Sequence, residues 1–527
     1  MYFRSNVLGL CFVLHLSGCT YLKYAAVQQE YARIQKATPA QKNLKHLIDH
    51  QTFYVVGHTE DTDCHCRTLP MAVAAYATDT ATYELVDTMS FANSGTHFGL
   101  NLPEGHYDLL VFADFDGNLQ FDKNEIIGKQ LLNVNPDIAP ENVISDVVIP
   151  LGPRQQASMI TPFAVRKTAE TRQSLFYPGG TLRDLNDPLF DKGMATLGMY
   201  DPAAFLEQAP TMFYALEEDY SYKVPVIFVH GIGGSAREFS ELAARLDRNL
   251  YKPWFFYYPS GGDLNQLSEL FYRIFLSGKL IPTDNMPIVI IAHSMGGLVV
   301  REALNRYDPS RDNKVRLFIS IATPFAGHPA AATGVNHGVM VLPAWRDLDP
   351  GSEFLQELFR LKIPSSIEYQ LIYAFGNSTT IKMGENSDGV VPLSSQLRPE
   401  AQAEAKAQFG FDAGHTDILQ NKALLDYLTA RIKTVNTVYP DDHIKAISQG
   451  GFDLPLDGYL PTLQYGIRNF GFYLVALHNG DIKPIDESQQ DFLKLLRDER
   501  QPRSLVEREF LKFKQEYPEY FLKTKTK

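Results

Sequence analysis

Residues 287–300, PIVIIAHSMGGLVV, hold the local pattern that decides the fold of much of this chain. The run from Pro287 to Ala292 is continuously apolar, which is typical of a strand buried on both faces of a parallel sheet. The run ends at His293 and Ser294, and a helical segment with glycines at its start follows. A serine on such a sharp strand-to-helix turn is a candidate nucleophile, because its hydroxyl protrudes where the helix N-terminus favours negative charge.

Ser294 by itself is compatible with two roles. The pentapeptide that begins at Ala292 departs from the Gly-x-Ser-x-Gly pattern at its first position, and the bare pattern is common by chance. A serine can also simply cap a buried helix. The strand before Ser294 and the helix after it favour the nucleophile.

Other continuous apolar runs surround this one and alternate with helical segments. The alternation predicts a doubly wound, mostly parallel α/β sheet, whose site lies at the carboxyl ends of the strands. The runs are VPVIFVHG (224–231), PWFFYYP (253–259), VRLFISIATP (315–324) and YQLIYAFGN (369–377).

The segment His230–Gly234, HGIGG, follows one of these strands. Its glycines let backbone N–H groups turn toward a substrate oxygen, as an oxyanion hole requires. A simple glycine turn after a strand is the alternative interpretation.

Asp388 follows another core strand, in the segment NSDGVVP (386–392). A carboxylate fixed beyond a strand end can hold a histidine in one tautomer. Asp347, Asp349 and Asp412 compete for this role, and an ordinary Asx-turn is the alternative for Asp388.

His415 precedes the last long helix of this region, in GHTDIL (414–419). The chain has 14 histidines, so a single one is weak support. His415 is distinguished by chain order, because Ser294, Asp388 and His415 follow the sequence Ser, Asp, His of one family of hydrolases. Asp417 is a candidate cap for the helix that follows.

With these motifs in view, residues 222–435 resemble the α/β-hydrolase lipase and esterase superfamily. The resemblance rests on VIFVHGIGG, VIIAHSMGGLV, IATPFAG (321–327) and SDGVVP, and several lipase families share an alanine at the position of Ala292. It implies a Ser294–His415–Asp388 triad, an oxyanion hole made by the N–H groups of Ile232 and Met295, an acyl-ester or lipid substrate, and no cofactor for catalysis.

The resemblance leaves the substrate open. Lipases, phospholipases, thioesterases and acyltransferases all use this triad, and a non-catalytic surface-binding lipoprotein with an inactive hydrolase domain is the alternative of a different class. Residues 327–361 fit either a lid over an acyl site or an ordinary helical crossover.

The N-terminus predicts export. An apolar run from Val7 to Leu16, too short to span a bilayer, is followed by Leu-Ser-Gly-Cys19, which resembles a bacterial lipobox. We expect a signal peptide at 1–18 and a lipidated Cys19 that anchors the chain to a bacterial membrane. Thr20, in place of an aspartate, favours the outer membrane. A plain secretory signal is the alternative.

The chain carries a net charge of -12 and has no basic stripe, which excludes nucleic acid as a partner.

Local sequence patterns divide the chain into segments. We expect an anchor and helix at 19–50, a small antiparallel β-sandwich at 51–150, a linker and packing segment at 151–220, the catalytic domain at 221–436, and an extension at 437–527. In the extension we expect one strand, FGFYLVALH (470–478), and helices near 486–500 and 504–517.

Two further motifs lie in the predicted β-sandwich. Cys64 and Cys66 favour a strained disulfide in an oxidising compartment, with a metal site that includes His58 and His65 as the alternative. The second motif matches positions 1, 3, 5, 9 and 12 of an EF-hand loop, without its glycine and with strands instead of helices on either side. Two interpretations are open: these residues bind Ca²⁺, or they only form turns. The residues are Asp114, Asp116, Asn118, Asp122 and Glu125.

Overall fold

The computed structural model describes most of the chain. Cys64, His65 and Cys66 lie outside the described residues, so the two hypotheses for them remain predictions. The described residues are 3–37, 42, 52–61, 69–80, 83–91, 97–139, 142–155, 160–164, 172–177, 180–209, 211–218, 222–281, 283, 285–310, 314–376 and 386–521.

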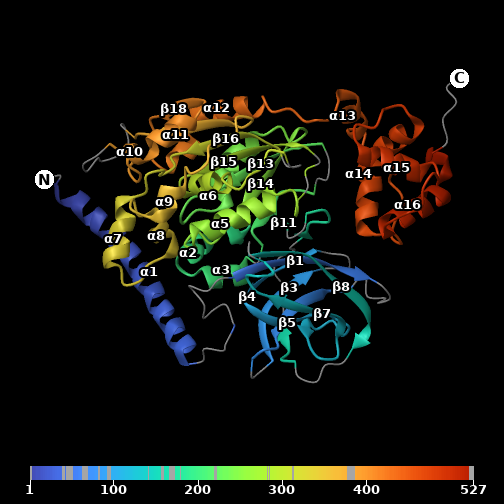
Figure 1. Ribbon diagram of the computed structural model, residues 1–527, viewed down its shortest axis with the longest axis horizontal. Coiled ribbons are helices and arrows are strands. Elements are labelled where there is room, and N and C mark those ends of the chain that lie inside the picture. Colours follow the sequence, from blue (N-terminus) through green and yellow to red (C-terminus); the bar gives the residue numbers. More distant parts are fainter. Residues whose placement is uncertain are drawn as a thin grey trace. The chain divides into compact units, whose positions relative to one another are not determined.

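A nine-stranded sheet forms the centre of the α/β domain (Figure 1), in the order β10-β11-β12-β14-β13-β15-β16-β17-β18. From β14 to β18 in this order, every neighbouring pair is parallel. The five apolar runs of the sequence supply all of these strands except β18, whose residues are mostly exposed. The bounds are Tyr251–Phe256 (β14), Val224–Val229 (β13), Pro287–His293 (β15), Lys314–Ile321 (β16), Glu368–Ala374 (β17) and Ala407–Phe411 (β18).

Helices connect these strands and pack around the sheet (Figure 1). Between β16 and β17 the chain forms three short helices instead of one crossover helix, and we call residues 327–361 the crossover segment. The helices of the domain are α4 (Ser240–Arg245), α5 (Leu264–Phe271), α6 (Met295–Ala303), α7 (Pro329–His337), α8 (Pro343–Leu348), α9 (Glu353–Glu357), α10 (Leu393–Gln396), α11 (Pro399–Glu404) and α12 (Lys422–Ile432).

The strand order reverses at β13. The next strand in the chain, β14, pairs with one edge of β13, and β15 pairs with the other. In doubly wound sheets, ligands bind at such a switch point, outside the carboxyl ends of the strands. His230–Gly234 follows β13 and Ser294 follows β15, so both segments lie at this point.

The segment predicted as a linker contributes to this sheet, which corrects the expectation for residues 151–220. Its strands are β10 (Arg172–Gln173), β11 (Gly180–Leu182) and β12 (Phe213–Ala215), and β12 pairs antiparallel with β14. The same segment forms α2 (Lys192–Tyr200) and α3 (Pro202–Gln208). Strands of two or three residues are too short to show a period, so their sequence resembled a connection.

The N-terminal β-domain differs from the predicted antiparallel sandwich in two respects. Its strands form one seven-stranded sheet, in the order β3-β2-β5-β7-β8-β1-β4, and β1 pairs parallel with β8. The bounds are Thr52–Asp61 (β1), Met71–Ala77 (β2), Glu84–Phe91 (β3), His97–Pro103 (β4), Gly105–Ala113 (β5), Ile126–Val134 (β7) and Val143–Gln155 (β8).

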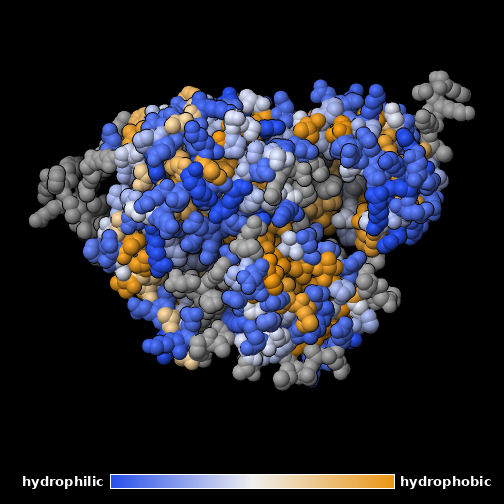
Figure 2. All heavy atoms as spheres, viewed as in Figure 1, coloured by the Kyte–Doolittle hydropathy of each residue, from blue (hydrophilic) through white to orange (hydrophobic). Residues whose placement is uncertain are grey.

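Both faces of the central strands of this sheet are buried. Alternate residues of β2, such as Met71 and Val73, enter one core cluster, and the residues between them, such as Ala72, enter a second one. The second cluster packs against Phe163 of β9 (Phe163–Ala164), which pairs with β6 (Gln120–Phe121). Hydrophobic residues also gather on the surface over this domain (Figure 2).

The C-terminal unit, residues 220–222 and 437–527, is helical and has its own core. The strand predicted at 470–478 is wrong, because these residues belong to α14 (Pro461–Asn479). A short apolar run cannot distinguish a strand from a buried helix. Pro461 in the first turn and Gly480, with φ 79°, mark the two ends of this helix. The two helices predicted after it are present as α15 (Glu487–Leu496) and α16 (Leu505–Glu516).

The first helix, α1 (Phe3–Ala37), ends shortly before Pro39. Its residues Tyr21, Tyr24 and Ala25 pack in a cluster with residues of the crossover segment and of α2. The Tyr21 ring stacks on Trp345, and its hydroxyl bonds to the backbone N–H and C=O of Met340. Among the described residues, no helix is long and apolar enough to cross a membrane.

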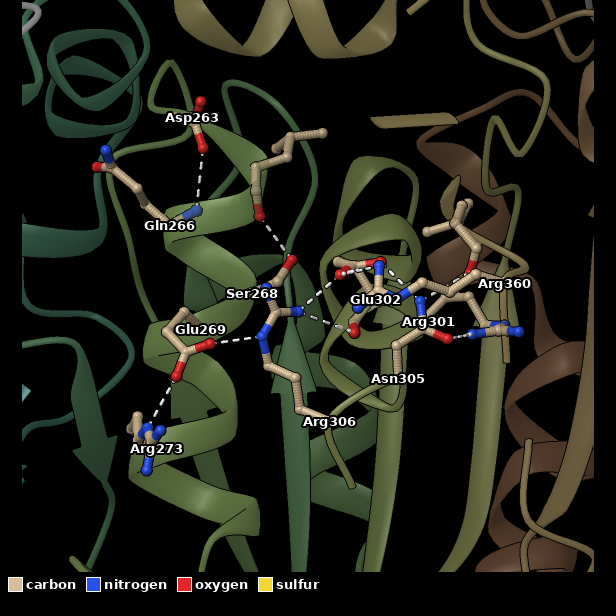
Figure 3. Close-up of polar contacts among 12 residues, drawn as sticks. Asp263, Gln266, Ser268, Glu269, Arg273, Arg301, Glu302, Asn305, Arg306 and Arg360 are labelled. Atoms are coloured by element: carbon tan, nitrogen blue, oxygen red, sulfur yellow. Dashed lines mark hydrogen bonds and ion pairs between the residues drawn. The ribbon is translucent and has the colours of Figure 1, made fainter. Parts of the chain in front are cut away.

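Buried ion pairs join α5 to α6, the helix that follows the candidate nucleophile (Figure 3). The guanidinium of Arg306, just after the end of α6, contacts Glu302 of α6 at 2.6 Å and Glu269 of α5 at 2.5 Å. Arg360 also donates to Glu302. Arg301 donates to both carboxylate oxygens of Glu404 on α11. These pairs fix α6, and therefore the turn at its start, against its neighbours.

Candidate active site

Ser294 occupies a strained turn between β15 and α6. Its φ of 53° and ψ of -131° are unusual for a residue with a side chain. The Ser294 N–H donates to the carbonyl of Ile321 on β16, and the Ser294 carbonyl accepts from Gly297. The turn is therefore held by the adjacent strand and by the helix, and the side chain is 5% exposed.

Two glycines let the chain pack closely around this serine. A Cβ on Gly231 would lie 2.7 Å from the Cβ of Ser294, and one on Gly296 would lie 2.5 Å from the carbonyl oxygens of Val229 and His230. Any side chain at either position would separate β13 from the turn. Both positions therefore require glycine because there is no space for a side chain, and not because of an unusual φ.

The structure brings Ser294, His415 and Asp388 together. The Nε2 of His415 lies 2.9 Å from the Ser294 Oγ, and its Nδ1 lies 2.6 Å from the Asp388 Oδ2. The His415 N–H also donates to the Asp388 carbonyl. A histidine held in this way carries its proton on Nδ1 and presents Nε2 as a base toward the hydroxyl.

The surroundings of His415 affect its pKa, and hydrogen bonds hold Asp388 in place. Burial, the main cause, lowers the pKa of His415, the Asp388 hydrogen bond opposes this, and His293 lowers it further. Asp388 accepts the N–H groups of Val390 and Val391 on one oxygen and the Gln396 side chain on the other. Asp388 is thus fully hydrogen-bonded and oriented toward the imidazole.

The loop after β13 is rigid. Gly234 donates to Gly231 in a tight turn, Gly233 has a φ of 66°, and its N–H donates to the Ser260 Oγ. The N–H groups of Ile232 and Met295 donate to none of the described residues. Both backbone donors are therefore available to a substrate oxygen, as an oxyanion hole requires.

The other carboxylates weighed for the triad have different neighbours. Asp347 accepts the Leu264 N–H at the start of α5, and burial raises the pKa of Asp347 to about 7. Asp349 accepts the Gly351 N–H in a turn. Asp417, the candidate helix cap, is instead the first residue of a short helix, Asp417–Gln420, and the helix α12 that follows is capped by Asn421.

Sequence reasoning did not identify several residues that support the site. His230 is buried, which lowers its pKa to about 4, and it stacks on Tyr258 with ring centroids 4.3 Å apart. It donates from Nδ1 to the Gly231 carbonyl and accepts the Tyr258 N–H on Nε2. Gln396 orients Asp388. No sequence signal indicates that Gln396 contacts Asp388. His230 and His293, by contrast, belong to the motifs HGIGG and AHSMGG, which could have drawn attention to them.

The acidic loop of the β-domain brings part of its predicted ligand set together. One oxygen each of Asp114, Asp116 and Glu125 lies within 4.8 Å of the others. Burial and the nearby carboxylates raise the pKa of Glu125. Leu119, at the position of the usual glycine, has a φ of 57°, so the loop keeps the backbone conformation that this glycine normally supplies.

The remaining members of the predicted set make local bonds. The Asn118 side-chain oxygen accepts the Gln120 N–H, and the Asp122 carboxylate accepts the Asn124 N–H. Asp114 itself accepts three backbone N–H groups of the loop. The same carboxylates therefore already act as turn formers, and Ca²⁺ binding stays a prediction.

One family model matches the part of the chain that contains Ser294. Residues 275–346 match the family described as lecithin:cholesterol acyltransferase. The matched segment includes Ser294 and most of the crossover segment, and it ends before Asp388 and His415.

Solved structures to which this chain is similar include lipases and an esterase. The mature lipase of Bacillus licheniformis is 18% identical over 42% of this chain and 98% of its own, with a TM-score of 0.32. A metagenomic carboxyl esterase is 17% identical over 42% of this chain and 78% of its own, with a TM-score of 0.32. Lipase B of Aspergillus fumigatus is 17% identical over 44% and 58%, with a TM-score of 0.32. No curated protein matches the sequence.

Proposed function

We propose that the chain is a serine carboxylic-ester hydrolase that forms an acyl-enzyme on Ser294. The observation that carries this proposal is the continuous hydrogen-bonded chain from the Ser294 hydroxyl through His415 to Asp388. A buried serine alone would need neither a histidine at its hydroxyl nor a carboxylate behind that histidine.

The proposed reaction follows from these contacts. His415 Nε2 takes the hydroxyl proton as the Ser294 Oγ attacks the ester carbonyl, and the N–H groups of Ile232 and Met295 stabilise the oxyanion. The imidazolium then gives its proton to the departing alcohol. Water repeats the sequence on the acyl-enzyme and releases the acid. Asp388 keeps the imidazole in the required tautomer throughout.

Acyl transfer is a second candidate, favoured by the family that residues 275–346 match. The first half of the reaction is the same, and an acceptor alcohol replaces water in the second half. Phospholipase and thioesterase activities differ only in the leaving group. The geometry of the triad does not separate these substrates.

We also propose that a lipidated Cys19 anchors the enzyme to the outer membrane of a bacterium. The lipobox-like sequence that ends at Cys19 and the identity of Thr20 support this proposal. Labelling with a radioactive fatty acid in the producing cells, abolished by Cys19→Ala, tests it. Membrane retention of a Cys19→Ala variant that carries no label would contradict it.

The test of the reaction compares the wild type with Ser294→Ala on a p-nitrophenyl ester series of increasing acyl length. We expect Ser294→Ala to lose roughly 10⁴-fold or more in turnover and to lose labelling by a fluorophosphonate probe. Ser240→Ala, at an exposed serine of the same domain, is the matched control. Full activity of Ser294→Ala would contradict the proposal, and unlabelled wild type would favour a non-catalytic binding protein.

A further inference from the structure

His293, directly before the nucleophile, is buried, with 3% of its surface exposed, and the triad mechanism gives it no role. Its Nε2 lies 2.9 Å from the backbone carbonyl oxygen of His415. A carbonyl oxygen can only accept a hydrogen bond, so the His293 Nε2 must carry a proton and donate. The proton on Nε2 leaves the other ring nitrogen, Nδ1, without one in a neutral imidazole.

The Nδ1 of His293 faces a carboxylate. This buried atom has no hydrogen-bond partner among the described residues, and the Oε2 of Glu238 is in the same condition. The two atoms lie 3.6 Å apart. This distance is too long for a direct hydrogen bond, but the Glu238 carboxylate is the polar group that faces the second ring nitrogen of His293. We treat the two side chains as a pair on this ground.

Glu238 also lies against the loop His230–Gly234, which we call the oxyanion loop. It lies in a short helical turn, Ala236–Phe239, directly after the glycines. A Cβ on Gly234 would lie 2.4 Å from its Oε1, so the carboxylate lies against the loop. On the other side, the rings of His293 and His415 have centroids 4.9 Å apart. Glu238 and His293 thus link the oxyanion loop, the nucleophile and the general base.

We propose that Glu238 and His293 act as a positioning pair for His415. The backbone of His415 is fixed at both ends, because its N–H donates to the Asp388 carbonyl and its C=O accepts from His293. The second bond ties the general base to the residue next to the nucleophile, and so sets the distance between Nε2 and the Ser294 Oγ. This inference rests on the proposed ester hydrolysis, and both residues act through His415 without touching substrate.

The experiment measures kcat and KM for a short p-nitrophenyl ester in the full chain. His293→Phe keeps a ring and removes the donor, and we expect kcat to fall roughly tenfold to a hundredfold with KM within about twofold. His293→Gln restores a donor near Nε2, so it should recover much of kcat. Glu238→Gln, whose amide keeps a polar group of the same size beside Nδ1, should stay close to the wild type, whereas Glu238→Leu should lower kcat.

His443→Phe is the matched control, because His443 is another buried histidine whose Nε2 lies 2.8 Å from a backbone carbonyl, that of Lys483, in the C-terminal unit. It should leave kcat per folded molecule unchanged. If His293→Phe does not fold, His293→Leu replaces it. The inference would be overturned if His293→Phe, or His293→Leu in its place, kept kcat within twofold of the wild type. It would also be overturned if His293→Phe and His293→Gln lost kcat equally. Neither result would contradict the proposed function. A wild type without esterase activity would overturn the proposed function and the inference together.

Discussion

Arg301 is the buried charge whose loss should cost this domain the most stability. Its guanidinium is 1% exposed and donates to both oxygens of Glu404, at 2.9 and 2.7 Å, to the Asn305 side chain at 2.9 Å, and to the Leu361 carbonyl at 2.5 Å. The Arg301→Met substitution keeps an apolar stem of similar length and removes every one of these donors.

The expected loss follows from what the substitution leaves behind. The Glu404 side chain is only 10% exposed, so it would remain as a nearly buried carboxylate without its cation. Removal of one partner from a buried pair costs about 3–5 kcal/mol. A domain is stable by only about 5–15 kcal/mol, so the variant should unfold at a much lower urea concentration.

Tryptophan fluorescence gives a domain-specific assay. The chain has 2 tryptophans. Trp254 lies on β14 and Trp345 on α8, so both report on the α/β domain and neither on the C-terminal unit. Arg245→Met is the matched control, because its partner Asp426 is 59% exposed and such surface pairs contribute about 0–1 kcal/mol.

A double substitution sharpens the test. Replacement of a whole buried pair by apolar residues is often neutral, because it is the unpaired charge that is unfavourable. Arg301→Met combined with Glu404→Leu should therefore recover most of the lost stability. The reasoning would be refuted if Arg301→Met destabilised the domain no more than Arg245→Met, or if the double variant were as unstable as the sum of the single ones.

Further predictions concern pH and metal binding. Because burial lowers the pKa of His415, kcat/KM should fall with decreasing pH only below 6.5, and a pH–rate profile with an acid limb above 6.5 would contradict this. The pKa of Asp347 is raised from 3.8 to about 7, so its contribution to stability is complete below the lower value and is lost as pH rises through the higher one. In urea titrations, Asp347→Asn should reduce the loss of stability between about pH 4 and pH 7, and an unchanged pH dependence would exclude this group as its source. If the acidic loop binds Ca²⁺, the ion should raise the melting temperature of the wild type but not of Asp116→Asn, and equal shifts in both proteins would indicate binding elsewhere.

The sequence predicted the core strands of the α/β domain because residues such as Ile290 and Phe228 belong to runs buried on both faces. It missed β18, whose sequence AQFGF is mostly exposed, and it mistook part of α14 for a strand. The chain order of Ser294, Asp388 and His415 indicated residues that the structure brings together. Local sequence could not predict the contacts of Glu238 or Gln396, because these contacts depend on how distant segments pack.

The contact of Tyr21 with Trp345 and Met340 has a consequence for how substrate would reach the enzyme. A helix rises about 1.5 Å per residue, so Cys19 lies only about 3 Å along the axis of α1 from Tyr21. With acyl chains on Cys19, only Thr20 would separate the attachment point from Tyr21, whose side chain contacts the crossover segment. Esters would then arrive by lateral diffusion within the same leaflet, and turnover would follow their surface density instead of their concentration in bulk water.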